Sequence, residues 1–323
     1  MLQKSSKNAR FLSRMGAQGT YGQAIFDLAE DNTDFFAVSA DLGIASGLDR
    51  FIKKYENRYI NVGIAEQNMV SIAAGIASDS APVFVSSWAP FATYRCGDQI
   101  RVYAGNMKKN IKIIGLASGM HIPKFGGSHY GLGDIAMIRS IPHITILSPC
   151  DGLEIYHAIY EAAAMDGPVY IRLTGGDYIP IINNWENMDF KIGKATHLKL
   201  GEDIVFIGCG SILYNVVEAV KKLEEMGISC SVINMHTIRP LDQVCLEECC
   251  KYKMIFTVEE HSVVGGLGSA VCEYMAEKKQ HPPVHKIGVN DFYPRPGEYE
   301  YLLKQCGLDI DGIVNNVLGA LQR

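Results

Sequence analysis

The stretch that decides the fold is residues 59–101, which read YINVGIAEQNMVSIAAGIASDSAPVFVSSWAPFATYRCGDQIR. Its apolar start, Tyr59 to Val62, predicts a short strand that runs into a glycine. A helix is expected to begin near Ala65, so Glu66 lies in the first helical turn. A glutamate at this place is often only a favourable partner for the helix dipole.

A second strand and a second helix follow in the same stretch. Val83 to Val85 predict a buried strand, and the next helix is expected to begin near Pro90. Trp88, Phe91 and Tyr94 are spaced three apart, so we expect them on one face of this helix and the turn before it. A lone aromatic triplet is usually core. Together with a carboxylate at the same ends of neighbouring strands, it indicates a ligand site of the open α/β type.

These residues carry a family resemblance. The run NVGIAEQNM, the spacing W-x-x-F-x-x-Y and the later run GGSHYGLGD resemble the pyrimidine-binding domain of the transketolase superfamily of thiamine-diphosphate enzymes. That superfamily includes transketolase, 1-deoxyxylulose-5-phosphate synthase and the β subunits of 2-oxo acid dehydrogenases. The resemblance extends from about Gly16 to the C-terminus.

The resemblance implies a cofactor site built around Glu66. Thiamine diphosphate acts as a carbanion sink, and its reactive tautomer needs a carboxyl group against ring nitrogen N1'. An apolar pocket that raises the pKa of the carboxyl group would suit this task. The residues that the resemblance implies at the cofactor are Glu66, the aromatic wall Phe91, Tyr94 and Trp88, and also Asp41 and Ile64.

A glycine-rich loop, Ala117 to Gly133, supplies candidate proton-transfer groups. His129 in Gly-Gly-Ser-His matches the G-x-[ST]-H segment of the superfamily, which implies binding of substrate hydroxyls or proton transfer. A loop histidine that only hydrogen-bonds to backbone is the alternative. The resemblance assigns no role to His121, and we expect Asp134 to cap a helix.

The length, the composition and the order of the expected strands and helices limit the possible architecture. With 323 residues, 48% hydrophobic and 20% charged, the chain is long enough for two domains with separate cores. Alternating strands and helices predict two doubly wound, mostly parallel α/β domains. We expect an N-terminal arm over 1–15, a pyrimidine-binding domain over 16–178, a linker over 179–200 and a transketolase C-terminal domain over 201–323. The arm is polar and basic, so we expect it to be loose or to rest on a partner.

Several partners and locations are disfavoured by composition. A net charge of −5 gives no reason to expect nucleic-acid binding. No apolar run reaches a membrane-spanning length, and the first thirty residues lack a signal-peptide core. Nine cysteines without metal-ligand spacing predict reduced thiols in a cytoplasmic protein.

The chain departs from the superfamily pattern at two places. Sugar-phosphate members carry an arginine just after the strand that corresponds to 169–173, where Gly175-Gly176 stand here and Arg172 comes two or three residues early. Whether the substrate is phosphorylated therefore stays open. The chain also has no G-D-G with a downstream asparagine pair, the motif that holds the diphosphate and Mg²⁺, so no metal ligand is expected on it.

The second departure implies that the diphosphate-binding domain is a separate polypeptide. The expected function is that of one subunit of a two-chain transketolase, most simply an α2β2 heterotetramer with thiamine diphosphate and Mg²⁺. It would transfer a two-carbon ketol unit from a ketose donor to an aldose acceptor. Two alternatives stay open: a decarboxylating subunit like the synthase or the dehydrogenase β subunits, and a non-catalytic interaction subunit.

Overall fold

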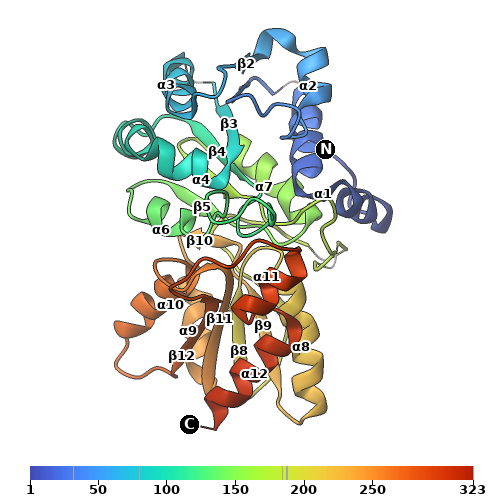
Figure 1. The fold of residues 1–323 in the computed structure, drawn as a ribbon, viewed down its shortest axis with the longest axis vertical. Coiled ribbons are helices and arrows are strands. Elements are labelled where there is room, and N and C mark those ends of the chain that lie inside the picture. Colours follow the sequence, from blue (N-terminus) through green and yellow to red (C-terminus); the bar gives the residue numbers. More distant parts are fainter. Residues whose placement is uncertain (32, 80, 184, 187, 323) are drawn as a thin grey trace.

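The computed structural model describes residues 1–31, 33–79, 81–183, 185–186 and 188–322. Two sheets flanked by helices lie one beyond the other along the long axis of the molecule (Figure 1). Most neighbouring strands are parallel, because helical crossovers return the chain to the same edge of each sheet. The prediction of two mostly parallel α/β domains is confirmed.

The first sheet has seven strands in the order β10-β5-β6-β4-β3-β1-β2. Its strands are nearly continuous apolar runs, since helices cover both faces. Only β10 is antiparallel, pairing with β5, among the described strands of this sheet. The strands are β1 (Phe36–Ser39), β2 (Tyr59–Asn61), β3 (Val83–Trp88), β4 (Ile111–Leu116), β5 (Thr145–Leu147), β6 (Val169–Arg172) and β10 (Thr237–Arg239).

Helices on the two faces of this sheet pack against two separate apolar clusters. Helices α1 and α7 lie together on one face, and α3 lies on the other with the turns that follow α4. The α-helices of this domain are α1 (Ser6–Glu30), α2 (Asp49–Lys54), α3 (Glu66–Ile76), α4 (Ala89–Thr93), α5 (Gly97–Gln99), α6 (Asp134–Arg139) and α7 (Gly152–Ala164).

The second sheet has five strands in the order β12-β11-β8-β9-β7, with β7 antiparallel to β9. Its strands are β7 (Thr196–Lys199), β8 (Ile204–Gly208), β9 (Cys230–Asn234), β11 (Met254–Ser262) and β12 (Val284–Val289). The flanking helices are α8 (Leu213–Glu225), α9 (Gln243–Glu248), α10 (Leu267–Ala276), α11 (Tyr299–Cys306) and α12 (Ile310–Leu321). Among the described residues, no helix is both long and apolar enough to cross a membrane.

The structure differs from the expected boundaries in three places. Segment 1–15 is not a loose arm: it is helical from Ser6, and Leu12 is buried in the α1–α7 face. The segment expected as a linker, 179–200, ends in β7, and its positions 184 and 187 lie outside the described residues. Strand β10 was not expected at all. It follows β9 of the second sheet yet completes the first, so it ties the two domains together.

His236 lies where the chain passes from β9 to β10 and is fully buried. Its ring stacks on Phe190 at 4.3 Å between centroids, and its Nδ1 is 3.0 Å from the Thr237 hydroxyl. The Nε2 atom meets no hydrogen-bond partner among the described residues. Burial, only partly offset by the Asp242 carboxylate, lowers the pKa of His236 to about 4. The ring is therefore neutral in the folded protein at neutral pH.

We predict that His236 makes the fold sensitive to acid. An unfolded histidine titrates near pH 6.5, so the unfolded state binds more protons between about pH 4 and 6.5. The free energy of unfolding should be fully retained above pH 6.5 and fall as the pH drops through this window, by about 2–3 kcal/mol from this group. His236→Phe should reduce the pH dependence of the free energy of unfolding, measured by urea denaturation across that range. The same change at the exposed His143 should leave the pH slope as in the wild type; an equal slope in both variants would contradict the assignment.

Candidate active site

Glu66 is the first residue of α3, directly after the end of β2. Gly63 takes a positive φ of 71° between strand and helix, a turn that other residues adopt only with strain. The Glu66 side chain is only 3% exposed, and both carboxylate oxygens lie 2.8 Å from Nη1 of Arg95. The buried acid therefore has a cation as its partner, where an apolar pocket alone was expected.

Arg95 links this acid to an aromatic row. It lies in the 3-10 turn after α4, and its guanidinium stands over the Phe91 ring, 4.1 Å from the centroid. The edge of the His129 ring meets Phe91 at 5.2 Å, and Phe125 flanks the same histidine at 4.9 Å. The structure thus brings three of the expected site residues, Glu66, Phe91 and His129, into one connected group.

The other two aromatic residues point elsewhere. Trp88 is the last residue of β3, and side chains alternate along a strand, so it follows Phe84 onto the α1–α7 face and packs there. Tyr94 lies beyond α4 and is half exposed, with its hydroxyl end close to Gly133. Burial of that hydroxyl and the nearby Asp134 carboxylate raise the pKa of Tyr94 to about 12. The three aromatics do not form one helical face.

Asp41 and Ile64 lie at the exposed rim of the first sheet. Asp41 has a φ of 60° and accepts a hydrogen bond from the Asn61 amide at 3.1 Å. The side-chain oxygen Oδ1 of Asn61 in turn accepts hydrogen bonds from the backbone N–H groups of Asp41 and Gly63. Asn61 therefore joins the ends of β1 and β2. Ile64 projects into solvent and is 78% exposed.

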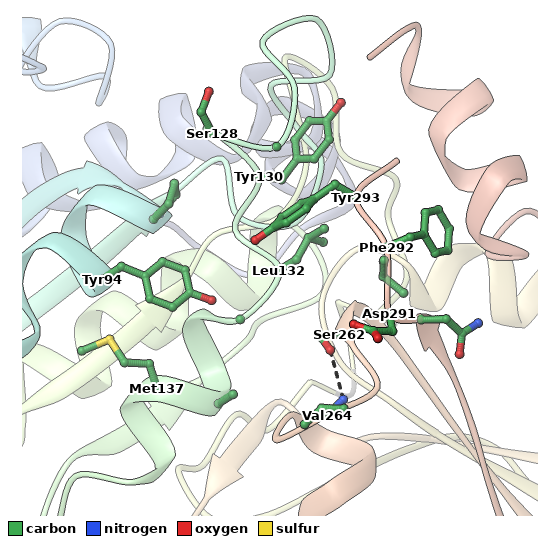
Figure 2. A pocket seen from close by; sticks show the side chains of 16 residues that line it. Tyr94, Ser128, Tyr130, Leu132, Met137, Ser262, Val264, Asp291, Phe292 and Tyr293 are labelled. Carbon is green, nitrogen blue, oxygen red and sulfur yellow. Dashed lines mark hydrogen bonds between the residues drawn. The ribbon is translucent and has the colours of Figure 1, made fainter. Parts of the chain in front are cut away.

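A cavity of about 670 Å³ opens between the two domains beside Tyr94 (Figure 2). One wall comes from the first domain, with Tyr94, Ser128, Leu132 and Met137. The opposite wall comes from the second domain, with Ser262 and Val264 at the end of β11 and the segment 289–293 at the end of β12. In Figure 2 the rings of Tyr94, Tyr130 and Tyr293 surround this space. The loop that carries His129 therefore lies at the boundary of the domains.

Three residues of the sequence analysis belong to that boundary. Asp134 does not cap α6: it is fully buried, and it accepts from Arg172 Nε at 2.9 Å and from the Tyr170 hydroxyl at 2.6 Å. Arg172 is also fully buried and faces the second domain. His121 lies 3.3 Å from the Glu260 carboxylate and stacks on Tyr299.

Sequence reasoning missed Arg95 and Asn61. Arg95 stands four residues after Phe91, a spacing at which side chains on a helix meet, and this signal could have suggested a cation over the ring. Asn61 at the end of a strand, before a glycine, is a common turn-forming position. Neither spacing indicates which carboxylate is the partner, because those partners come from other elements.

The residues present fit one half of thiamine diphosphate. A buried carboxylate beside a half-buried phenylalanine ring and an exposed isoleucine suits a flat, basic, apolar ring such as the aminopyrimidine. For the metal-bound diphosphate, the described residues contain no group of three or more His, Cys, Asp or Glu side chains that could hold a metal ion.

Comparisons with known proteins show the family of the chain. The family model of the transketolase pyrimidine binding domain matches residues 15–179, and that of the transketolase C-terminal domain matches residues 193–313. The 6-deoxy-6-sulfo-D-fructose transketolase subunit of a Clostridium species is 34% identical over 91% of this chain and 91% of its own length. An apulose-4-phosphate transketolase subunit from Actinobacillus succinogenes is 34% identical over 90% of this chain and 93% of its own.

A solved structure gives the same result. A protein described as "Split gene transketolase, inactive beta4 tetramer" superposes with a TM-score of 0.85 at 34% identity, covering 95% of this chain and 98% of that one. The fold and the family models thus define a protein with a pyrimidine-binding domain followed by a transketolase C-terminal domain. The chain belongs to the transketolase family and is similar to the subunits of split-gene transketolases.

We predict that Arg95 stabilises Glu66 in the chain alone. Arg95→Ala leaves a buried carboxylate without its cation, so the free energy of unfolding should fall by about 1–2 kcal/mol, less than for a fully buried pair because Arg95 is 43% exposed. Adding Glu66→Gln should recover much of this loss. The changes in the free energy of unfolding, measured by urea denaturation, should therefore be non-additive in the double-mutant cycle. Strictly additive effects of the two substitutions would show that the pair contributes nothing.

Proposed function

We propose that this chain is the subunit of a two-chain, thiamine-diphosphate-dependent transketolase that binds the pyrimidine half of the cofactor. The observation that carries the proposal is the buried Glu66 carboxylate adjoining the Phe91–His129 pair. The reaction would transfer a two-carbon ketol unit from a ketose to an aldose. The names of the two related subunits favour this reaction over the decarboxylating alternative.

The chain's own residues would hold and polarise the cofactor. Bound thiamine diphosphate supplies the carbanion sink that makes cleavage of the C–C bond feasible. Glu66 would accept a hydrogen bond from the pyrimidine ring nitrogen N1' when that nitrogen is protonated, and a carboxylate has enough lone pairs to keep Arg95 as well. Phe91, with Ile64 beside the helix start, would provide the apolar wall. Tyr94 and Asp41 would support the rim of the site, whereas Trp88 packs on the α1–α7 face of the sheet.

His129 would move protons to and from the sugar oxygens. Its ring is partly exposed, and its Nδ1 lies 3.0 Å from the Ser128 hydroxyl, which leaves Nε2 for a substrate hydroxyl. Histidine suits such transfers near neutral pH. Arg172 is fully buried and so would not contact a substrate anion. The acid groups named in the two relatives' substrates, sulfo and phosphate, would need another cation here.

A partner subunit would complete the site from the carboxyl edge of the first sheet. The ends of β1, β2, β3 and β4 are each followed by a large exposed apolar side chain: Ile44, Ile64, Tyr94 and Phe125. Such a row on one edge suits burial against another protein. The partner would be the N-terminal subunit that grips the diphosphate and Mg²⁺, in an α2β2 assembly. The related β4 tetramer is described as inactive, which supports this dependence. Nine free thiols fit a reducing compartment such as the cytoplasm.

The test is reconstitution of the chain with an N-terminal subunit encoded by a neighbouring gene. The pair, with thiamine diphosphate and Mg²⁺, should transfer ketol units, while each chain alone should not. Glu66→Ala should lower kcat by at least about 100-fold, the typical worth of a positioned acid–base group. The exposed Glu56→Ala serves as a matched control and should keep wild-type activity.

Screening phosphorylated, sulfonated and free ketoses would identify the donor. An active Glu66→Ala pair would contradict the proposed role of this residue. A pair that binds no thiamine diphosphate by calorimetry would instead favour the non-catalytic alternative.

A further inference from the structure

The loop between β4 and α6, residues 117–133, carries His129, and we call it the histidine loop. It leaves the first sheet after β4 and returns to it at α6, but its path runs along the second domain. A backbone bridge between Gly119 and Gly131 closes its base, with N···O distances of 3.1 and 2.8 Å. The bridge therefore joins the two ends of the loop.

The Glu260 carboxylate of β11 contacts the first arm of this base, which is the backbone at Gly119 and Met120. It is 1% exposed, and its Oε1 accepts from the Met120 N–H at 2.5 Å. Its Oε2 accepts from the Tyr299 hydroxyl at 2.7 Å and lies 3.3 Å from His121 Nε2. The approach is so close that a Cβ on Gly119 would lie 2.4 Å from Oε1. A buried carboxylate of the second domain thus gathers three donors, two of them from the histidine loop.

The second arm of the base, which is the backbone at Gly131 and Leu132, is bound at the same end of β11. Arg172 Nη2 donates to the Gly131 carbonyl at 2.9 Å and to the Glu260 carbonyl at 2.7 Å. Two residues after Glu260, the Ser262 N–H donates to the carbonyl of Leu132, the neighbour of Gly131, at 2.7 Å. Both arms of the loop are therefore fixed against residues 260–262 of the second domain.

The tip of the loop rests on the segment before α11. The Gly297 N–H donates to the Pro123 carbonyl at 3.3 Å, and the Lys124 ammonium pairs with Glu298 at 3.0 Å on the surface. A Cβ on Gly127, two residues before His129, would meet the Tyr293 ring at 2.9 Å. The backbone next to His129 is therefore in van der Waals contact with the second domain.

We propose that the second domain is a clamp that positions His129, with Glu260, Tyr299 and Tyr293 as positioning residues. The first domain meets the His129 ring through the Phe91 ring, whereas the second domain fixes the backbone on both sides of it. This deepens the proposed function and rests on it for the role of His129. The clamp itself is a statement about the loop and is testable without any reaction.

The first measurement is amide hydrogen exchange on the chain alone, comparing Tyr299→Phe and Tyr293→Ala with the wild type. Tyr299→Phe removes one hydrogen bond to a buried charge and keeps the ring on His121. Such a bond shifts a local opening equilibrium by about 10- to 100-fold, so exchange within 117–133 should accelerate to that extent. The strands of both sheets should keep wild-type protection.

A matched control is Tyr274→Phe in α10, which also removes a tyrosine hydroxyl bonded to a glutamate, Glu247, but far from the loop. It should leave exchange in 117–133 unchanged. Tyr293 is largely exposed, so its replacement does not threaten folding and keeps the test decisive if Tyr299→Phe proves unstable. Wild-type exchange in the loop of a folded Tyr299→Phe or Tyr293→Ala variant would overturn the clamp.

The second measurement is ketol transfer by the reconstituted pair. Both clamp variants should lower kcat at least tenfold while the affinity for thiamine diphosphate, measured by calorimetry, stays that of the wild type. A faster-exchanging loop with unchanged kcat would overturn the positioning role and leave only a structural one. If the wild-type pair transfers no ketol unit, the proposed function fails, and the exchange experiment alone still decides the clamp.

Discussion

The structure depends on the guanidinium of Arg172, a permanent charge held with no exposure to solvent at the seam of two domains. A buried unpaired charge is very costly, so its surroundings must supply a counter-charge and acceptors. The Asp134 carboxylate and two backbone carbonyls do so, one carbonyl from each domain. The Tyr170 hydroxyl donates to the same Asp134 oxygen, Oδ2, as Arg172 Nε does. This one requirement fixes the end of β6, the start of α6 and the end of β11 relative to one another.

A second arginine–carboxylate pair differs in one respect that matters. Glu66 is as buried as Asp134, but its partner Arg95 stands at the surface and leans on Phe91. A fully buried pair is rigid, because opening it would leave both charges without water or partner. A pair with one exposed member can open, since water can solvate the released guanidinium. The same chemistry thus serves as a fixed joint between domains and as an adaptable contact at the candidate site.

Local patterns predicted much of the fold and part of the site. Apolar runs and glycines located the strands around Glu66, because their spacing reflects burial on a sheet. The same reasoning failed for Trp88, where strand alternation rather than helical spacing decides the direction of the side chain. It also failed for β10, which three residues form and whose pairing with β5 depends on where the second domain rests. Arg172 and Asp134 looked like a displaced phosphate ligand and a cap, since no sequence spacing reveals a partner in another domain.

The division of labour between the domains follows from these contacts. The first domain presents its acid at the carboxyl edge of a parallel sheet, the edge where such sheets bind ligands. A loop long enough to bring a histidine to that acid has too little of its own structure to hold it there. The second domain supplies the missing contacts through the end of β11 and the segment before α11. On this view the contribution of the C-terminal domain to the site is the rigidity of a segment that belongs to its neighbour.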